Sequence, residues 1–429
     1  MSVGVEQIPS GVRVPQTVPR MARVHQQFPR PRVADVAAAV RTELGRLDLG
    51  RRIRPGSRIA VTAGSRGIRD IVPILRAAVD VLRQAGAEPL LIAAMGSHGG
   101  GTEEGQRRLL QHLGVTPESI GAPLATSMET VELGRTRNGF VAYCDRNAAA
   151  CDGILAVNRL KPHTAFGTPF GSGLMKILGV GLGKAPGATQ IHQRGPGQMA
   201  AAIREIAERV IATGRVCGGL AILENAYDET ARLVGIAPEE IPAAEVGLFP
   251  EARALMPRLP VDQMDLLIVD EVGKNYSGTG MDVNVIGRWR IAGLAEPQVP
   301  HAERIVALRL SAASEGNAQG IGLADFTTKA LVDRIDFGAT YLNCIVSTYV
   351  QRGMLPMVLA TERDAVLAAL GSLGIGDPLR ARIVRVPNTL HLEDVWVSEA
   401  LVETVRGASH IGGVAPPEPL RFDQDGRLC

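Results

Sequence analysis

Three side chains suited to covalent or acid–base chemistry follow one another in a single glycine-rich stretch. His163, Lys176 and His192 occur in this order, and Gly171 and Gly173 stand between the first histidine and the lysine. An imidazole titrates near neutral pH, and a lysine amine is a nucleophile. Glycines let the backbone approach a ligand closely. The stretch is therefore predicted to wrap a cofactor or a phosphate, and the alternative is a loop followed by a helix with spaced glycines.

The residues before this stretch predict the elements that must position it. A buried strand over residues 58–63 is followed by a helix over 69–85 and by a second strand over 89–94. Thr102 then has the residue type of a helix N-cap. Strands and helices that alternate over so short a distance are typical of a parallel sheet with right-handed crossovers.

An arginine and a histidine come directly after these two strands. Arg66 follows the first strand and His98 follows the second. Open α/β sheets bind ligands at the carboxyl ends of their strands, so both side chains are candidates for contact with a substrate. The alternatives are a surface or ion-paired arginine and a solvated loop histidine.

The second half of the chain repeats the α/β rhythm with fewer reactive groups. A buried strand over 265–269 leads into a loop that contains Lys274 and Tyr276, as a ligand-facing loop would. Helices are predicted over 326–335 and over 362–370.

A chain of 429 residues favours two α/β domains. We expect mainly parallel sheets and an active-site cleft between the domains. The expected parts are an extended segment over 1–34, a catalytic and cofactor-binding domain over 35–258, and a C-terminal domain over 259–429.

Composition narrows the class of ligand. A net charge of +2 and an aromatic content of 3% offer neither an electrostatic field nor stacking platforms for nucleic acid. The five cysteines include no C-x-x-C pair, and no run of 18 apolar residues occurs. We expect a cytoplasmic protein with a small-molecule ligand and no membrane or nucleic-acid partner.

The order of the reactive residues resembles that of the nickel-pincer cofactor-dependent lactate racemase family. The resemblance is carried by Pro162-His163, by the run Gly-Ser-Gly-Leu-Met-Lys that ends at Lys176, and by His192. It implies that Lys176 bonds covalently to a pyridinium-3,5-dithiocarboxylic acid mononucleotide–nickel cofactor, which Gly171 and Gly173 contact. It also implies that His192 is a ligand of the nickel.

The same resemblance assigns roles to residues on other predicted loops. His98 and His163 would act as acid and base on the two faces of the substrate, and Arg66 would bind its carboxylate. Lys274 and Tyr276 would contact the substrate from the second domain. The family carries glutamine and lysine after the tyrosine, whereas Ser277 follows Tyr276 here. This difference predicts a 2-hydroxy acid other than lactate.

The function that follows is an isomerase, a racemase or epimerase that inverts C2 of a 2-hydroxy acid by hydride transfer to the lysine-linked nickel cofactor. Such an enzyme depends on cofactor biosynthesis proteins. Two alternatives use the same scaffold: a zinc-dependent hydrolase or lyase, and a non-catalytic protein that binds a small ligand.

Overall fold

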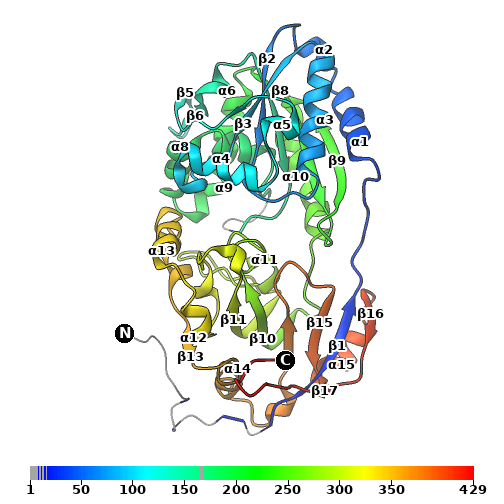
Figure 1. Cartoon of the computed structure of the whole chain (residues 1–429), viewed down its shortest axis with the longest axis vertical. Coiled ribbons are helices and arrows are strands. Elements are labelled where there is room, and N and C mark those ends of the chain that lie inside the picture. The colour runs from blue at the N-terminus through cyan, green and yellow to red at the C-terminus, as the bar shows by residue number, and fades with distance from the viewer. Residues whose placement is uncertain (1–7, 9–10, 12–13, 16, 165–168) are drawn as a thin grey trace. The chain divides into compact units, whose positions relative to one another are not determined.

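The computed structural model divides into two compact units (Figure 1). The first unit consists of residues 30–256, and the second combines residues 257–429 with the described part of residues 1–29. The structure describes the whole chain except residues 1–7, 9–10, 12–13, 16 and 165–168.

A six-stranded sheet in the order β4-β3-β2-β7-β8-β9 forms the centre of the first unit as described. Neighbouring strands run parallel except β9, which is antiparallel to β8. Their bounds are β2 Arg58–Ala63, β3 Glu88–Ala93, β4 Leu124–Ala125, β7 Gly153–Arg159, β8 Val216–Glu224 and β9 Thr230–Ile236. Runs rich in Val, Ile, Leu and Ala make the central strands β2, β7 and β8, which are covered on both faces and almost fully buried.

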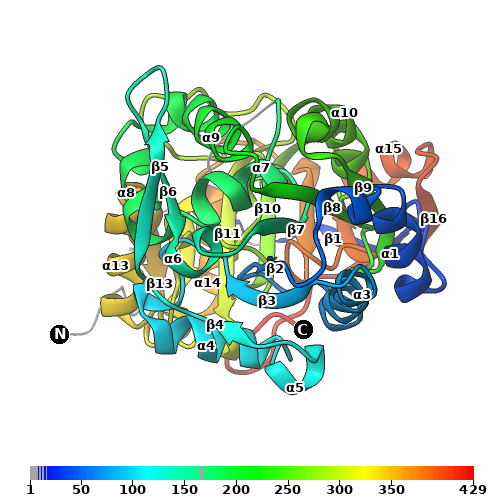
Figure 2. The same ribbon diagram turned by 90° about the horizontal axis from the view of Figure 1, so that it is seen from above.

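Helices cover both faces of this sheet. Seen from above, α1 and α3 lie on one face, and α7, α9 and α10 lie on the other (Figure 2). Thr102 caps α4 by accepting the backbone N–H of Gly105, which confirms the N-cap predicted there. The helix bounds in this unit are α1 Val36–Gly45, α2 Leu49–Arg52, α3 Ile71–Gln84, α4 Glu103–His112, α5 Pro117–Ile120, α6 Arg146–Ala149, α7 Leu174–Lys176, α8 Lys184–His192, α9 Pro196–Ile211 and α10 Ile241–Ala254.

The glycine-rich stretch forms an almost continuous helical segment. A turn of π-helix, η2 (Ile177–Gly181), joins α7 to α8. Side chains at two glycines of this turn would collide with neighbouring backbone: a Cβ on Gly179 would lie 2.9 Å from the carbonyl oxygen of Ile203, and one on Gly181 would lie 2.6 Å from that of Ala94. These glycines therefore let the segment pack closely against α9 and against the end of β3.

Beside this segment lies a separate antiparallel pair of strands, β5 (Thr130–Arg135) and β6 (Val141–Asp145). Among the described residues, no helix is both long and apolar enough to cross a bilayer. All five cysteines are free thiols.

The second unit contains a nine-stranded mixed sheet, counted over the described residues, with the order β13-β12-β11-β10-β14-β15-β1-β16 and with β17 paired to β1. The strands from β13 to β14 are parallel, and β15, β1 and β16 continue the sheet in antiparallel fashion. Strand bounds are β1 Arg20–Gln26, β10 Gln263–Val272, β11 His301–Leu310, β12 Phe326–Thr328, β13 Met357–Leu359, β14 Ile383–Val386, β15 Asp394–Ser398, β16 Ile411–Val414 and β17 Glu418–Pro419. Helix bounds are α11 Val283–Ile286, α12 Lys329–Val332, α13 Phe337–Val346, α14 Glu362–Gly371 and α15 Val402–Arg406.

The proline-containing segment near the start of the chain contributes a strand, β1, to the second sheet. Strand β1 pairs with both β15 and β16, and Ala22 and Val24 are fully buried. Pro19 and Pro29 lie outside the strand, so every residue of β1 keeps the backbone N–H that a ladder needs. Residues 20–26 are thus an interior strand of the second unit, whereas we expected them to lie extended over the surface.

The helix predicted over 326–335 is wrong in its first three residues, which form β12. The hydroxyl groups of Thr327 and Thr328 donate to carbonyl oxygens of β11 at 2.8 Å, which ties this short strand to its neighbour. Thr328 then caps α12 by accepting the N–H of Leu331 at 3.0 Å. Two β-branched residues between buried strands favour the sheet over the helix.

Candidate functional site

Three loops that carry predicted site residues follow the carboxyl ends of parallel strands of the first sheet. Ser65 and Arg66 follow β2, His98 follows β3, and His163 follows β7. Strand β2 lies between β3 and β7, and adjacent strands are about 4.8 Å apart. The two histidines therefore follow strands on opposite sides of the strand that leads to Arg66.

His98 is held by a serine from the neighbouring loop. Its ring is half-buried, and its Nδ1 shares a short hydrogen bond with the hydroxyl of Ser65. A hydrogen bond at one ring nitrogen fixes the orientation of an imidazole and influences which nitrogen carries the proton. We did not predict a role for Ser65, although its place beside Arg66 at the end of a strand is a usable signal.

Lys176 has the electrostatic surroundings of a reactive amine. Its side chain is half-buried, and its Nζ is 3.5 Å from the hydroxyl of Ser172. Desolvation, followed by the charge of Arg66, lowers the pKa of Lys176 to about 8. About one-tenth of the amine is therefore uncharged, and nucleophilic, at pH 7, far more than for an ordinary lysine.

His192, at the end of α8, is the electrostatic neighbour of that lysine. Burial, followed by the charge of Lys176, lowers the pKa of His192 to about 4. The imidazole is therefore neutral at physiological pH, which is the form that binds a metal. The charge of Lys176 thus acts on His192. Their roles toward a cofactor stay a prediction.

Arg66 is the basic residue whose charge acts on Lys176. Its pKa is lowered by desolvation and then by Arg159, a residue of β7. Arg159 itself is paired with Glu224, whose carboxylate also accepts the backbone N–H of Arg69 at 2.9 Å. Arg66 is an exposed residue, as in the surface alternative, and within the described part of the chain no carboxylate pairs with it. Its contact with a substrate stays a prediction. The guanidinium is suited to bind an external carboxylate.

Two glycines predicted to contact a cofactor are already required by packing. A Cβ on Gly171 would lie 2.2 Å from the carbonyl oxygen of Lys161, and one on Gly173 would lie 2.5 Å from the carboxylate of Glu245. The absence of side chains at these positions has this internal reason, whether or not a cofactor touches them. Contact with a cofactor there stays a prediction.

Glu245 is a buried carboxylate that sequence reasoning missed. It lies on α10, and its Oε2 accepts the N–H of Met175 at 2.9 Å, in the short helix that carries Lys176. Burial raises the pKa of Glu245 to about 7. A carboxylate at the start of a helix stabilises the exposed N–H groups there, so Glu245 helps to hold the Lys176 turn.

His163 lies in the loop that follows β7, next to the buried Pro162, and is half-buried. The loop continues into residues 165–168, which are outside the described part of the chain. That His98 and His163 face each other across a substrate stays a prediction.

In the second unit, the ammonium of Lys274 is held by hydrogen bonds within the protein. Its ammonium donates to the carbonyl oxygen of Gly278 at 2.8 Å, to Gln319 Oε1 at 2.9 Å and to Asn343 Oδ1 at 2.5 Å. These three acceptors match the three N–H donors of a lysine. Lys274 would have to release some of them before it could bind a substrate.

Tyr276 lies in a small polar cluster at the carboxyl ends of β10 and β14. Its hydroxyl donates to Glu271, and its ring meets that of His391 edge-on, with the centroids 6.0 Å apart. Desolvation, followed by the hydrogen bond to Glu271, raises the pKa of Tyr276. The phenol thus stays protonated, and its contact with substrate remains a prediction.

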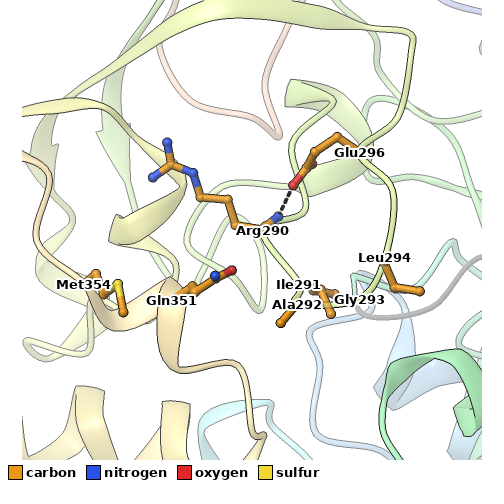
Figure 3. A pocket seen from close by; sticks show the side chains of 8 residues that line it. All are labelled: Arg290, Ile291, Ala292, Gly293, Leu294, Glu296, Gln351 and Met354. Carbon is orange, nitrogen blue, oxygen red and sulfur yellow. Dashed lines mark hydrogen bonds between the residues drawn. The ribbon is translucent and has the colours of Figure 1, made fainter.

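A surface pocket of the second unit contains none of the predicted site residues (Figure 3). The loop 290–296 lines it together with Gln351 and Met354. Its charged groups are engaged within the protein: Arg290 binds Asp325, and the Glu296 carboxylate accepts the backbone N–H of Arg290 at 2.7 Å. This pocket is therefore not the candidate active site.

The donor set restricts how a metal could be held. Among the described residues, no group of three or more His, Cys, Asp or Glu side chains is arranged to hold a metal ion. His192 fits the single protein ligand that a cofactor with its own donor atoms would need.

Comparison with known proteins gives the fold. No protein-family profile and no curated protein sequence matches the chain. The chain is similar in structure to the lactate racemase apoprotein from Thermoanaerobacterium thermosaccharolyticum, with a TM-score of 0.52 and 12% identity over 86% of this chain and 99% of that one. A Thermotoga maritima protein from a structural genomics programme matches with a TM-score of 0.46 and 15% identity over 83% of this chain and 97% of that one. The chain thus has a lactate racemase-like α/β fold, which confirms the predicted fold class.

Proposed function

We propose that the chain is a racemase or epimerase of a 2-hydroxy acid and that it uses a nickel-pincer nucleotide attached to Lys176. The observation that carries this proposal is the Lys176–His192 pair. It joins an amine with a pKa of about 8 to an imidazole that is neutral at physiological pH. The fold shared with the lactate racemase apoprotein supports the same function at the level of architecture.

The residues present fit such a cofactor. Among the described residues, the amine of Lys176 makes only a long contact of 3.5 Å with the hydroxyl of Ser172, so little would be lost when the amine forms a covalent bond. His192 offers one neutral nitrogen donor. When bound, the cofactor supplies a reversible acceptor for the hydride on C2 of the substrate.

The substrate carboxylate would be bound by Arg66. A guanidinium can bind a carboxylate through two parallel hydrogen bonds, which fixes the position of C2 relative to the protein. The charge of Arg159 acts on Arg66, and Glu224 is ion-paired with Arg159. The charge of Arg66 thus stays available for the substrate.

His98 and His163 would move the hydroxyl proton. Hydride leaves C2 more easily when a base removes the proton from the hydroxyl group, and imidazole has a suitable pKa range for that task. Ser65 orients the ring of His98. Because the two histidines follow strands on either side of β2, each can serve one face of a planar 2-keto acid, and return of the hydride to either face gives both configurations.

The substrate is proposed to be larger than lactate or differently substituted. Tyr276 is followed by Ser277, where lactate racemases carry a glutamine and then a lysine. Lys274 is a candidate to replace the positive charge of the lysine that lactate racemases carry. Because it forms three internal hydrogen bonds, it could bind a substrate only after its loop rearranges.

A panel of enantiopure 2-hydroxy acids tests the activity. The protein is produced together with cofactor biosynthesis proteins and incubated with lactate, malate, aryl lactates and sugar acids, and the products are separated by chiral chromatography. Inversion of at least one acid, absent in Lys176→Ala, is the expected result. A protein that carries nickel and the Lys176 adduct but inverts no member of the panel would contradict the proposed reaction.

A further inference from the structure

Lys184, the first residue of α8, carries a fully buried charge that the proposed chemistry does not use. Its ammonium lies 2.5 Å from the carbonyl oxygen of Ala93, 3.0 Å from Gln106 Oε1 and 3.1 Å from Asp145 Oδ2. The side chains of Lys184 and Asp145 are both completely inaccessible to solvent. Desolvation of such a pair costs several kcal/mol per ion, so a buried ion pair contributes little net stability by itself.

Gln106 extends this network to the loop of His98. Its side chain is also fully buried, and its Nε2 donates to the carbonyl oxygens of Gly96 at 2.9 Å and His98 at 3.3 Å. The amide thus accepts a hydrogen bond from Lys184 and donates to the backbone on both sides of Ser97. In the opposite direction, Gly96 donates its N–H to the carbonyl oxygen of Gly181 at 3.1 Å.

The network joins four elements at one point. Lys184 begins α8, Ala93 ends β3, Asp145 ends β6 and Gln106 lies on α4. Asp145 also donates its backbone N–H to the carbonyl oxygen of Leu182 at 2.7 Å, which ties β6 to the same turn. Lys184 stands midway along the chain between Lys176 and His192, so the network connects the segment of both residues to the loop of His98.

We propose that Lys184 and Gln106 are positioning residues that hold the His98 loop in register with the helical segment of Lys176 and His192. The effect of this positioning on catalysis rests on the proposed function. The distances on which it depends lie within the first unit alone. A lysine with a positive φ of 50°, buried beside an amide that bonds two loop carbonyls, is a costly arrangement for packing alone.

Gln106→Glu separates the two halves of the network. The carboxylate keeps an acceptor for Lys184 but has no N–H for the carbonyl oxygens of Gly96 and His98, and the adjacent ammonium favours its ionised form. Gln190→Glu is the matched control. Gln190 lies on α8, accepts the N–H of Val141 at 3.1 Å and donates to the carbonyl oxygen of the same residue at 2.5 Å. Among the described residues, it forms no hydrogen bond with the His98 loop.

The first readout uses the purified full chain without cofactor. Backbone amide exchange of residues 96–101 should be about tenfold faster in Gln106→Glu than in wild type, as expected for the loss of hydrogen bonds that hold a loop. Gln190→Glu should leave exchange in that loop unchanged. If Gln106→Glu does not fold, Gln106→Met, which also lacks the N–H donors, is measured in its place.

The second readout uses the cofactor-loaded enzyme. Gln106→Glu should lower kcat about tenfold or more with little change in KM, because His98 and not the substrate carboxylate site is displaced. Unchanged loop exchange in the folded variants, or an equal fall of kcat in Gln190→Glu, would overturn the inference. Faster exchange in Gln106→Glu alone, with a loaded wild-type protein that inverts no acid, would support the loop restraint and contradict the racemase instead.

Discussion

The positive charge of Lys176 acts on His192. Burial and this charge together lower the pKa of His192 to about 4. A neutral imidazole beside a partly neutral amine is an arrangement suited to one metal ligand and one covalent attachment point. Both residues belong to the segment from α7 to α8, whose glycines Gly179 and Gly181 pack closely against neighbouring backbone. The first predictions test these electrostatic properties without any cofactor.

Lys176 should react with amine reagents at a lower pH than an ordinary lysine. In competition labelling of the purified chain, the pH dependence of Lys176 acetylation should have a midpoint near its pKa of about 8. Arg66→Gln should move the midpoint upward because it removes a nearby positive charge. Arg69→Gln, in the same loop, should leave it in place. A midpoint near 10.5, the ordinary lysine value, would contradict the proposed surroundings of Lys176.

Glu245→Gln should stabilise the protein increasingly as pH rises. The pKa of Glu245 is raised from 4.5 to about 7, so the folded chain binds the proton more tightly than the unfolded chain. The wild type therefore loses unfolding free energy between about pH 4.5 and pH 7, by an amount on the order of 3 kcal/mol, whereas glutamine cannot ionise. Denaturant unfolding at pH 5 and pH 8 measures this difference.

The matched variant for this experiment is Glu251→Gln, which removes a half-exposed carboxylate from the same helix, α10. Its stability difference from wild type should not grow in the same way. If the two variants show the same pH dependence, Glu245 is not the buried acid that the contact with Met175 indicates.

The strands that bear the site are readable from the sequence because each is a short buried run with a turn after it. The runs at 58–63 and 89–94 correspond to β2 and β3, and the parallel order then places Arg66 and His98 at the same carboxyl end of the sheet. Strands β1 and β12 were missed because their partners are distant in sequence or their length is only three residues.

The polar residues that support the site could not be found in the same way. Ser65, Gln106, Lys184 and Glu245 have ordinary residue types, and only their burial and their partners distinguish them. The glycines illustrate the converse problem. Gly171 was assigned to cofactor contact from its type, and the structure shows that the carbonyl oxygen of Lys161 already occupies the space beside it.

Arg66→Lys should raise KM about tenfold or more in the loaded enzyme while changing kcat less. Lysine retains the charge but cannot form two parallel hydrogen bonds with a carboxylate. Arg69→Lys is the control, because among the described residues Arg69 forms a hydrogen bond through its backbone N–H, with Glu224, and none through its side chain. Equal effects of the two substitutions on KM would show that Arg66 is not the carboxylate-binding residue.

His98→Ala and His163→Ala should each lower the rate by about 10²–10⁴-fold and leave cofactor loading intact. His112→Ala, at the exposed end of α4, should be indistinguishable from wild type. Full activity in either site variant would contradict the pairing of the two histidines. Loss of nickel from His98→Ala would instead indicate that this residue is a metal ligand.

Intact-mass spectrometry combined with nickel analysis tests the central claim most directly. The protein is purified from cells that also contain the cofactor biosynthesis proteins, and peptide mapping locates any adduct. We predict one nickel per chain, an added mass on Lys176, loss of both in Lys176→Ala, and loss of nickel with retention of the organic adduct in His192→Ala. Lys329→Met, at a partly exposed lysine of α12, provides a lysine control that should keep the adduct. An unchanged covalent mass in Lys176→Ala, or a wild-type chain that acquires neither nickel nor adduct beside a lactate racemase that acquires both, would contradict the assignment.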